Sequence, residues 1–357
     1  MAKKFTLQDA IDASLDYSGK TSIPSYMKWS GNKNHPEYLR GYRTALRNAG
    51  RNRRYVDPFA GSASLPLNVV PGQEALLSDF DDMNIAFHNA IKEGTIGDEL
   101  DFSDFMRDGV VNRKTFFEDL RGGTPYGRVL ATTKNRPYSL DVSWPPRKNS
   151  LNYIINELNE ANINPASNLE AIKAWARMQN AGFRGDARFN RNPARGVKRW
   201  YNISANEENY RPVKRNYYAY RPLMENFNFV NMDVFDFLND MELDPKRDFM
   251  PIDPPYIKEA GNYDHGIDHR KLVRVLGSLK DEGMPIVATN SELAMPLYQD
   301  EGFDTFLMDR RNNSGAKRTS RGVKPEMVAV TPGLISEREW KGPRIQKSLF
   351  EIAWGLV

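Results

Sequence analysis

Short apolar runs that end in polar or turn residues alternate with segments of helical periodicity at both ends of the 357-residue chain. Segment 269–282, for example, places four aliphatic side chains on one helix face, at Leu272, Val273, Leu276 and Leu279. This alternation indicates an α/β fold. The predicted strands are 54–56, 74–78, 229–232, 249–252, 285–289, 305–308 and 327–331, and the predicted helices are 36–48, 83–92, 151–159, 169–180 and 269–282.

The alternation stops between about Gly94 and Met224, where Gly, Pro, Asn and Arg are frequent. We interpret 94–224 as an inserted, mainly helical domain. It would divide one α/β domain into an N-terminal part, 1–93, and a C-terminal part, 225–357. At one domain per ~150 residues, the chain length allows this organisation.

The composition excludes several classes of chemistry. The chain has no cysteine and four scattered histidines, which removes disulfides and thiol catalysis and leaves few ligands for zinc. We therefore predict no metal site. No apolar run approaches the ~20 residues of a membrane span, and the N-terminus lacks the apolar core of a signal peptide. We expect a cytoplasmic protein without a membrane partner.

The net charge of +4 conceals a separation of charge along the chain. Between Gln73 and Asp104 there are nine acids and one lysine, whereas between Arg184 and Arg221 there are ten cations, three acids and seven aromatic residues. A second basic run, Arg310 to Lys324, carries six cations. Cations neutralise phosphates and flat rings stack on bases, so both runs are typical of a nucleic-acid surface. For either run alone, a solvated charged face is an equally good interpretation.

Two strand ends near the N-terminus carry candidate ligand-binding residues. In RRYVDPFAGSASLPL a strand ends in Asp57 and turns through Gly61 into a helix, and in EALLSDFD the next strand ends in Asp79. Ligands of open α/β sheets bind beyond such ends, where a carboxylate can accept the two hydroxyls of a ribose. Taken alone, the first segment is better explained as a tight turn. An acid at Asp79, Asp81 or Asp82 could instead cap the following helix.

The motif IDPPY, Ile252 to Tyr256, directly follows an apolar strand and carries the most specific signal in the chain. Pro254 and Pro255 stiffen the loop and remove its amide donors, so the local backbone offers mainly carbonyl acceptors. Asp253 adds a carboxylate and Tyr256 a ring that can stack. Such a site suits an amino group on a heterocycle, whereas a merely rigid turn would not require Asp and Tyr.

Together these segments resemble the Dam-type, α-class DNA adenine methyltransferases. MKWSGNK is similar to the family's KWxGxK segment, DPFAGSAS to its DPFxGxG cofactor loop and SDFD to its acidic strand end. NFVNMDVFDFL resembles the segment that holds the cofactor's adenine, while IDPPY and VATNSE resemble the catalytic strand and the next one. RRNNSGAKRTSRGVKPEMVAV resembles the basic C-terminal hairpin. Ser62-Ala63-Ser64 departs from the Gly-rich cofactor loop, and the insertion matches only loosely, which leaves the recognition sequence open.

The resemblance implies a Rossmann-like class I methyltransferase sheet with an inserted target-recognition domain, S-adenosylmethionine as cofactor, and double-stranded DNA and a companion restriction endonuclease as candidate partners. It implies catalytic roles for Asp253, Pro254, Pro255 and Tyr256. The implied cofactor-binding residues are Trp29, Lys33, Asp57, Phe59, Gly61, Asp79, Asp233, Phe235 and Asp253. The implied DNA-binding residues are Arg184, Arg188, Lys198, Arg199, Arg311, Lys317, Arg318 and Arg321.

The residue types agree with the implied mechanism. The exocyclic amine of adenine is a poor nucleophile, because its lone pair is delocalised into the ring. Asp253 and the Pro254 carbonyl would accept its two N–H groups as it attacks the sulfonium methyl, so catalysis would consist of positioning and electrostatics. The base must leave the duplex first, and Tyr256 could stack on it. Methylation of the cytosine amine and a catalytically silent DNA-binding protein remain as alternatives.

Overall fold

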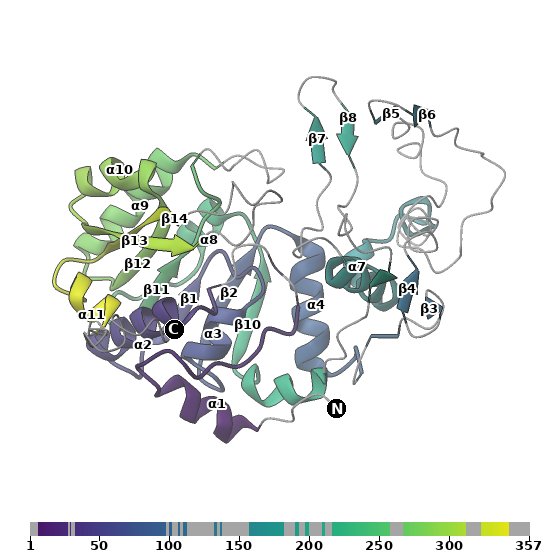
Figure 1. Ribbon diagram of the computed structural model, residues 1–357, viewed down its shortest axis with the longest axis horizontal. Coiled ribbons are helices and arrows are strands. Elements are labelled where there is room, and N and C mark those ends of the chain that lie inside the picture. Colours follow the sequence, from purple (N-terminus) through teal and green to yellow (C-terminus); the bar gives the residue numbers. More distant parts are fainter. Residues whose placement is uncertain are drawn as a thin grey trace, which may run out of the picture.

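A computed structural model describes residues 6–27, 29, 33–97, 100–101, 106–107, 110–112, 132–133, 136–137, 157–181, 190–192, 197–199, 209–210, 216–257, 267–311 and 323–342. A seven-stranded sheet forms its centre, in the order β10-β2-β1-β11-β12-β14-β13 (Figure 1). The first five strands in this order are parallel to one another, and β14 runs antiparallel to both of its neighbours. The strands are β1 (Arg54–Asp57), β2 (Ala75–Asp79), β10 (Phe227–Asn231), β11 (Asp248–Ile252), β12 (Ile286–Ser291), β13 (Asp304–Arg311) and β14 (Val323–Val330).

Alternate residues of the central strands enter two separate hydrophobic cores, one on each face of the sheet. Tyr55 of β1 belongs to the first core and its neighbour Val56 to the second. The first core also takes buried side chains from α1 (Leu7–Ser14), α2 (Pro36–Ala49), α3 (Ser64–Val69), α4 (Asp82–Glu93) and α11 (Glu337–Lys341). The second takes them from α8 (Val234–Asp240), α9 (His269–Asp281) and α10 (Met295–Asp300). Because both faces are covered, central strands such as β11 are apolar runs without alternation.

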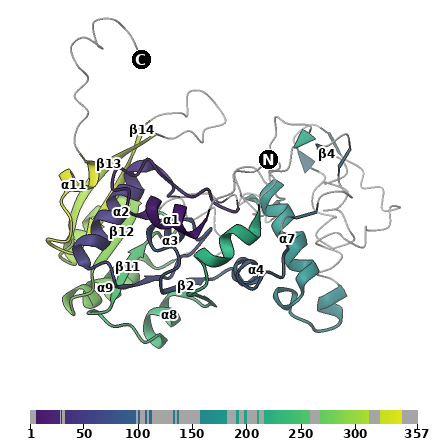
Figure 2. The same cartoon turned by 90° about the horizontal axis from the view of Figure 1, so that it is seen from below.

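Helix α4 connects the sheet to residues from the segment 94–224. In both views it lies between the sheet and α7 (Leu169–Ala181) (Figures 1 and 2). Phe87 of α4 contacts the ring of Trp175 in α7 and that of Tyr217 in the 3₁₀ helix η5 (Tyr217–Leu223). The segment therefore packs against α4 both at α7 and at η5, just before the chain enters β10.

The other described elements of this segment are short. They are η3 (Pro165–Ser167) and the strands β3 (Met106–Arg107), β4 (Val110–Asn112), β5 (Thr132–Thr133), β6 (Arg136–Pro137), β7 (Asn190–Asn192), β8 (Val197–Arg199) and β9 (Asn209–Tyr210). They pair as β3-β4-β9, β5-β6 and β7-β8. No described helix is both long and apolar enough to cross a bilayer.

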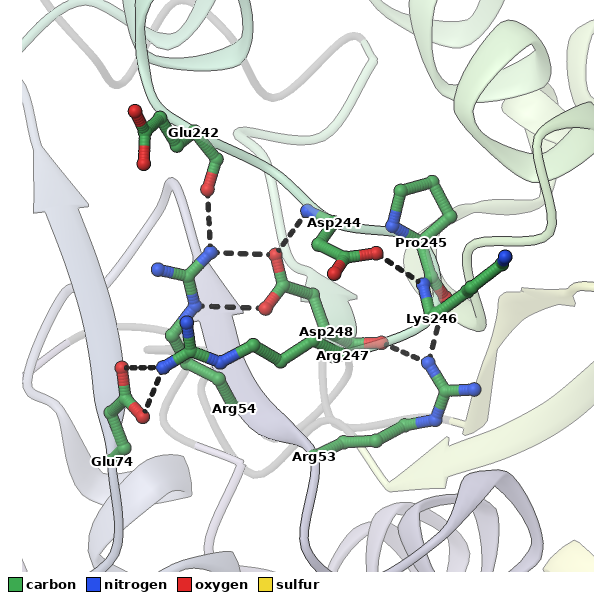
Figure 3. Close-up of polar contacts among 9 residues, drawn as sticks. All are labelled: Arg53, Arg54, Glu74, Glu242, Asp244, Pro245, Lys246, Arg247 and Asp248. Carbon is green, nitrogen blue, oxygen red and sulfur yellow. Dashed lines mark hydrogen bonds and ion pairs between the residues drawn. The ribbon is translucent and has the colours of Figure 1, made fainter.

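The amino ends of β1 and β11 are tied together by buried charges (Figure 3). Nε and Nη2 of Arg54 donate to the two carboxylate oxygens of Asp248 at 2.8 and 2.7 Å, and the Asp244 N–H donates to the same carboxylate at 2.8 Å. Arg53 donates to the carbonyls of Pro245 and Asp248 at 2.7 and 2.9 Å. Both oxygens of the fully buried Asp248 carboxylate therefore accept hydrogen bonds from neighbouring residues of the protein.

The α/β fold and all seven predicted strands are confirmed, with boundaries that differ by a few residues. Strands β13 and β14 extend further into the basic hairpin than predicted, because eight successive residue pairs continue the ladder from Asp304 to Arg311. The helix expected after the Gly61 turn is α3. The short helices α8 and α10 were not predicted, since six or seven residues are too few to show a helical period. Of the predicted helix 151–159, residues 151–156 lie outside the described residues.

Candidate active site

Polar side chains gather at the carboxyl ends of four neighbouring parallel strands. Asp57 ends β1, Asp79 ends β2, Asp253 follows β11 and Asn290 lies near the end of β12. The strand order β2-β1-β11-β12 makes these four ends adjacent. The sheet therefore brings together residues separated by up to 233 positions in sequence, at the edge where open α/β sheets bind ligands.

The Asp57 carboxylate is buried, with 4% of the residue exposed, and accepts the Phe59 N–H at 2.9 Å. Burial raises the pKa of Asp57 to about 8, and the nearby negative charges of Asp253 and Asp79 act in the same direction. The Phe59 N–H opposes this rise only in part. A cation bound beside this carboxylate would reverse the shift.

Gly61 forms the bend of the loop that follows β1. Its φ of +48° favours glycine, and a Cβ there would lie 2.7 Å from Nε1 of Trp29. Its N–H donates to Asp79 at 2.9 Å, and its carbonyl accepts from Nδ2 of Asn84 and Nε2 of His88, both at 2.8 Å. The loop conformation is therefore fixed by an acid at the end of β2 and by two residues of α4.

The His88 imidazole bonds the Gly61 carbonyl in its neutral form. It is fully buried, and burial lowers its pKa to about 4, although the Gly61 carbonyl opposes this effect. Since a carbonyl can only accept, Nε2 carries the proton, and Nδ1 accepts from the Tyr26 hydroxyl. The imidazole also stacks on Phe229 of β10 at 4.8 Å between ring centroids. The ring orientation is thus determined on three sides.

Asp79 belongs to this loop as much as to β2. Besides the Gly61 N–H, its carboxylate accepts the Asp81 N–H at 3.0 Å and Nδ2 of Asn84 at 3.2 Å. Burial nevertheless raises its pKa. Asp81 is the N-cap of α4, accepting the Asn84 N–H, and its pKa rises to about 7 through burial and the charge of Asp79.

Asp233 and Phe235 lie at the start of α8, beside β10. Asp233 is the N-cap and accepts the Phe235 N–H at 2.8 Å, which stabilises the helix terminus. Phe235 is partly buried against the second core, and Nζ of Lys271 lies 4.0 Å from its ring centroid. The capping bond gives Asp233 a structural role in addition to the cofactor role that the sequence suggested.

Asp253 accepts from two side chains of other elements. Thr289 Oγ1 of β12 donates to its Oδ1 at 2.7 Å, and Nζ of Lys33 lies 3.1 Å from the same atom. Lys33 also donates to the Tyr256 hydroxyl at 2.6 Å and to Glu326 of β14 at 2.9 Å. Burial raises the pKa of Asp253; the attraction of Lys33 lowers it and the repulsion of Glu326 raises it.

The backbone after the two prolines is fixed by β12. Oδ1 of Asn290 accepts the Ile257 N–H at 3.1 Å, and Ser291 Oγ donates to the Ile257 carbonyl at 3.3 Å. Pro254 is buried, whereas Pro255 and Tyr256 are partly exposed. Asp253, with 25% of its side chain exposed, is thus held firmly yet reachable from outside, as an acceptor for an external amine must be.

The family model of the D12 class N6 adenine-specific DNA methyltransferases matches residues 29–307, more than three quarters of the chain. The chain belongs to this family. It is therefore an adenine-specific DNA methyltransferase that transfers a methyl group from S-adenosylmethionine to N6 of adenine in DNA. A search of curated proteins found no match. The resemblance inferred from the motifs is confirmed, and the adenine amine is favoured over the cytosine amine.

The carboxyl ends of the methyltransferase sheet fit the chemistry of this cofactor. S-adenosylmethionine carries a sulfonium and an ammonium group, and the acids at this edge have raised pKa values because burial and mutual repulsion disfavour their charged forms. The small residues of the Gly61 loop allow the backbone to approach a ligand closely. Among the described residues, no three His, Asp or Glu side chains are grouped as a metal site.

The methyltransferase's predicted DNA-binding residues are mostly outside the described residues. This holds for Arg184, Arg188, Lys317, Arg318 and Arg321. Lys198 and Arg199 lie in β8 and Arg311 ends β13, so only their backbone positions are described. Their contacts with DNA stay predictions.

Sequence reasoning missed four residues of the site: Asn84, His88, Thr289 and Glu326. Asn84 and His88 lie four residues apart in α4, on one helix face beside the Gly61 loop. Polar residues within an otherwise apolar helix face were the available signal. Glu326 likewise precedes an unbroken apolar run, Met327 to Val330, whose residues are all buried. A buried acid next to such a run indicates a paired or functional group.

Proposed function

We propose that Asp253, Pro254, Pro255 and Tyr256 form the methylating centre of this enzyme. The observation that carries the proposal is the Asp253 carboxylate, held by Thr289 and Lys33 yet partly exposed at the carboxyl end of β11. Asp253 and the Pro254 carbonyl accept the two N–H groups of the adenine amine. This interaction directs the nitrogen lone pair toward the incoming methyl, so the residues act by orientation and electrostatics.

We further propose that the cofactor lies along the ends of β1, β2 and β10. The cofactor supplies a methyl group already activated by the sulfonium charge. Asp57 receives the cofactor's ammonium group, while Phe59, Gly61 and Trp29 shape the loop against which it lies. Asp79, Asp233 and Phe235 bind its nucleoside part, and Asp253 and Lys33 lie next to its methionine end.

Double-stranded DNA is the proposed form of the substrate, with the target adenine rotated out of the helix. The N6 amine of a paired adenine lies within the duplex, so a rigid site such as the loop after β11 can reach it only after flipping. Tyr256 stacks on the flipped base. The bond from Lys33 to its hydroxyl fixes one edge of the ring and supports this role.

The segment 94–224 is proposed as the inserted target-recognition domain, mainly helical, between the parts 1–93 and 225–357. Its α7 and η5 pack against α4, the helix whose Asn84 and His88 fix the cofactor loop. Bases read by the insertion would therefore lie close to the cofactor. Its basic and aromatic composition supports contact with phosphates and bases. A companion restriction endonuclease stays a prediction.

Replacement of Asp253 tests the proposed centre. Asp253→Ala is expected to reduce methyl transfer from labelled S-adenosylmethionine to mixed-sequence duplex by at least ~100-fold, because a preorganised acceptor is lost, with DNA affinity largely kept. Asp281→Ala, at the exposed end of α9, is the matched control and should match the wild type. A fully active Asp253→Ala enzyme would refute the assigned role.

A separate measurement tests the basic hairpin. Arg311→Ala and Lys317→Ala should each weaken duplex binding and reduce the slope of log affinity against log salt by about 0.9, because each lost phosphate contact releases one fewer condensed counterion. Binding is measured by fluorescence anisotropy between low and moderate salt, without cofactor. If the slope is unchanged in both variants, these side chains do not contact the phosphates.

A further inference from the structure

A buried ion cluster lies behind the methylating centre and includes a residue with no role so far. The Lys33 ammonium is surrounded by Asp253 Oδ1 at 3.1 Å, Glu326 Oε1 at 2.9 Å and the Tyr256 hydroxyl at 2.6 Å. The side chains of Lys33 and Glu326 are only 4% and 3% exposed, against 25% for Asp253. Glu326 is thus the member of the acid pair that lies away from the open side.

The fold accounts for the position of Glu326. It pairs with Ser291 at the carboxyl end of β12, because β14 runs antiparallel to that strand. An early residue of β14 therefore reaches the edge where the parallel strands end. Glu326 also lies outside residues 29–307, to which the family model extends, so the match does not include it.

Core packing alone does not require an acid at this position. Residues 327–330 that follow it in β14 are all apolar and buried, and an apolar side chain at 326 would avoid the cost of transferring a carboxylate out of water. Buried ion pairs contribute little net stability compared with well-packed apolar residues. The retained charge points to a role in the chemistry next to it.

We propose that Glu326 is a positioning residue for methyl transfer: by holding Lys33, it sets the orientation and charge of Asp253 and the orientation of Tyr256. The inference rests on the proposed role of Asp253. Glu326 itself contacts neither adenine nor cofactor. Its effect passes through the three ammonium donors of Lys33, each of which has an oxygen partner in the cluster.

The charges explain why a second acid is needed. One ammonium paired with one carboxylate would neutralise Asp253 and draw its electron density toward Lys33. With Glu326 present, the ammonium is shared between two carboxylates, so the cluster retains negative charge. Asp253 then keeps the acceptor strength that an adenine amine requires, since hydrogen bonds to ionised acceptors are the stronger ones.

Several charged and titratable groups interact electrostatically with Asp253, and among the described residues Glu326 is the other acid that pairs with Lys33. Burial and the charge of Glu326 both raise the pKa of Asp253, and Lys33 lowers it. Removing the Glu326 charge should therefore move the acid limb of the rate profile to lower pH, because that limb follows protonation of Asp253. The groups whose charges interact with that of Asp253 are Lys33, Glu326, Asp57, Tyr42, Tyr55 and Tyr298.

The test uses the full-length enzyme in single-turnover methyl transfer with saturating S-adenosylmethionine and duplex, measured across pH. Glu326→Gln keeps the shape and removes the charge. We expect a plateau rate lower by roughly 10- to 100-fold, as for misplaced catalytic groups, with the acid limb at lower pH and unchanged DNA affinity. Glu282→Gln, an exposed acid just after α9, is the matched control.

A second variant separates the effect of the charge at residue 326 from that of its side-chain length. Glu326→Asp keeps the charge but shortens the side chain, so it should lower the plateau rate while leaving the acid limb where it is in the wild type. The inference is overturned if Glu326→Gln keeps the wild-type rate and pH profile. It is also overturned if activity is lost only in proportion to folded protein, with the acid limb unmoved in both variants.

Asp253→Asn in the same assay distinguishes this inference from the proposed function. If Asp253→Asn is inactive and Glu326→Gln behaves as the wild type, only the role of Glu326 fails. If Asp253→Asn retains the wild-type rate, the role of Asp253 fails and that of Glu326 fails with it.

Discussion

Strand β11 begins at Asp248 and is followed directly by Asp253. The partners of these two acids differ in how far they neutralise the carboxylate. At the amino end, fully buried Asp248 receives two bonds from the Arg54 guanidinium and one from the Asp244 N–H (Figure 3). At the carboxyl end, Asp253 shares one ammonium with a second carboxylate, Glu326. The first acid is neutralised by the fold, whereas the second is not.

The neighbouring strands show the same difference. Asp57 at the end of β1 receives the Phe59 N–H but has no basic side chain among its hydrogen-bond partners in the described residues, and its pKa rises to about 8. The amino end thus stabilises the folded chain by itself. The carboxyl end holds acids whose charged forms are disfavoured by burial, as expected if they receive a cation. Active sites commonly store such strain, which the rest of the fold offsets.

The largest expected effect on stability comes from the amino end. Asp248→Ala leaves the Arg54 guanidinium, 13% exposed, without its carboxylate, and breaking a buried pair typically costs about 3–5 kcal/mol. Chemical denaturation of wild type and variant measures the loss. Asp253→Ala is the counterpart at the other end and should change the free energy of unfolding by no more than ~2 kcal/mol. Equal losses at both ends would contradict the comparison.

Replacing Asp57 should raise the free energy of unfolding at high pH, whereas replacing Asp248 lowers it. Because its pKa in the folded state is raised to about 8 from 3.8, the fold is favoured at low pH and loses stability as the pH rises through 8. Asp57→Asn removes this loss, and each pKa unit corresponds to about 1.4 kcal/mol. We expect the variant without cofactor to be more stable than the wild type at pH 9 by at least ~2 kcal/mol, with little difference at pH 4. Denaturation at both pH values measures this, and a destabilised variant at pH 9 would count against the account.

The Gly61 loop offers a smaller and more local change. Gly61→Ala places a Cβ 2.7 Å from Nε1 of Trp29 at a φ of +48°, which should cost about 1–3 kcal/mol and weaken cofactor binding. Ala63, two residues on, also has positive φ, +50°. Ala63→Gly is the control, expected within ~1 kcal/mol of the wild type because glycine accepts this conformation. Calorimetric unfolding with and without cofactor compares the two; similar losses would show that the close approach at residue 61 is unimportant.

The smallest effect is expected at the exposed rim of the amino end. Arg247 and Glu74 form an ion pair at 2.6 Å, but each side chain is about half exposed, 55% and 53%. Solvent screening limits such pairs to about 0–1 kcal/mol. Arg247→Ala should therefore leave the free energy of unfolding from chemical denaturation nearly unchanged, unlike Asp248→Ala at the next residue. A loss as large as that of Asp248→Ala would mean that burial does not determine how much each ion pair contributes to the free energy of unfolding.

The sequence was sufficient for the sheet because both faces of its central strands are buried, which leaves uninterrupted apolar runs such as 249–252. Asp57, Asp79 and Asp253 could be found for the same reason, since Asp57 and Asp253 directly follow such runs and Asp79 follows one after Ser78. The partnership of Lys33 with Glu326 could not, because 293 positions separate the two residues and only strand pairing brings them together. Ala63 shows a further limit: it stands at the second glycine of the family's DPFxGxG loop and keeps the left-handed conformation although its side chain disfavours it.

The most direct test of the central claim, that the acids at the carboxyl end are held for a cation, is the number of protons released when S-adenosylmethionine binds. It is obtained by titration calorimetry at pH 7 in buffers of different ionisation enthalpy. With the pKa of Asp57 at about 8 before binding, the account predicts release of about one proton by the wild type and markedly less by Asp57→Asn. Binding without proton release, or equal release by both proteins, would contradict it.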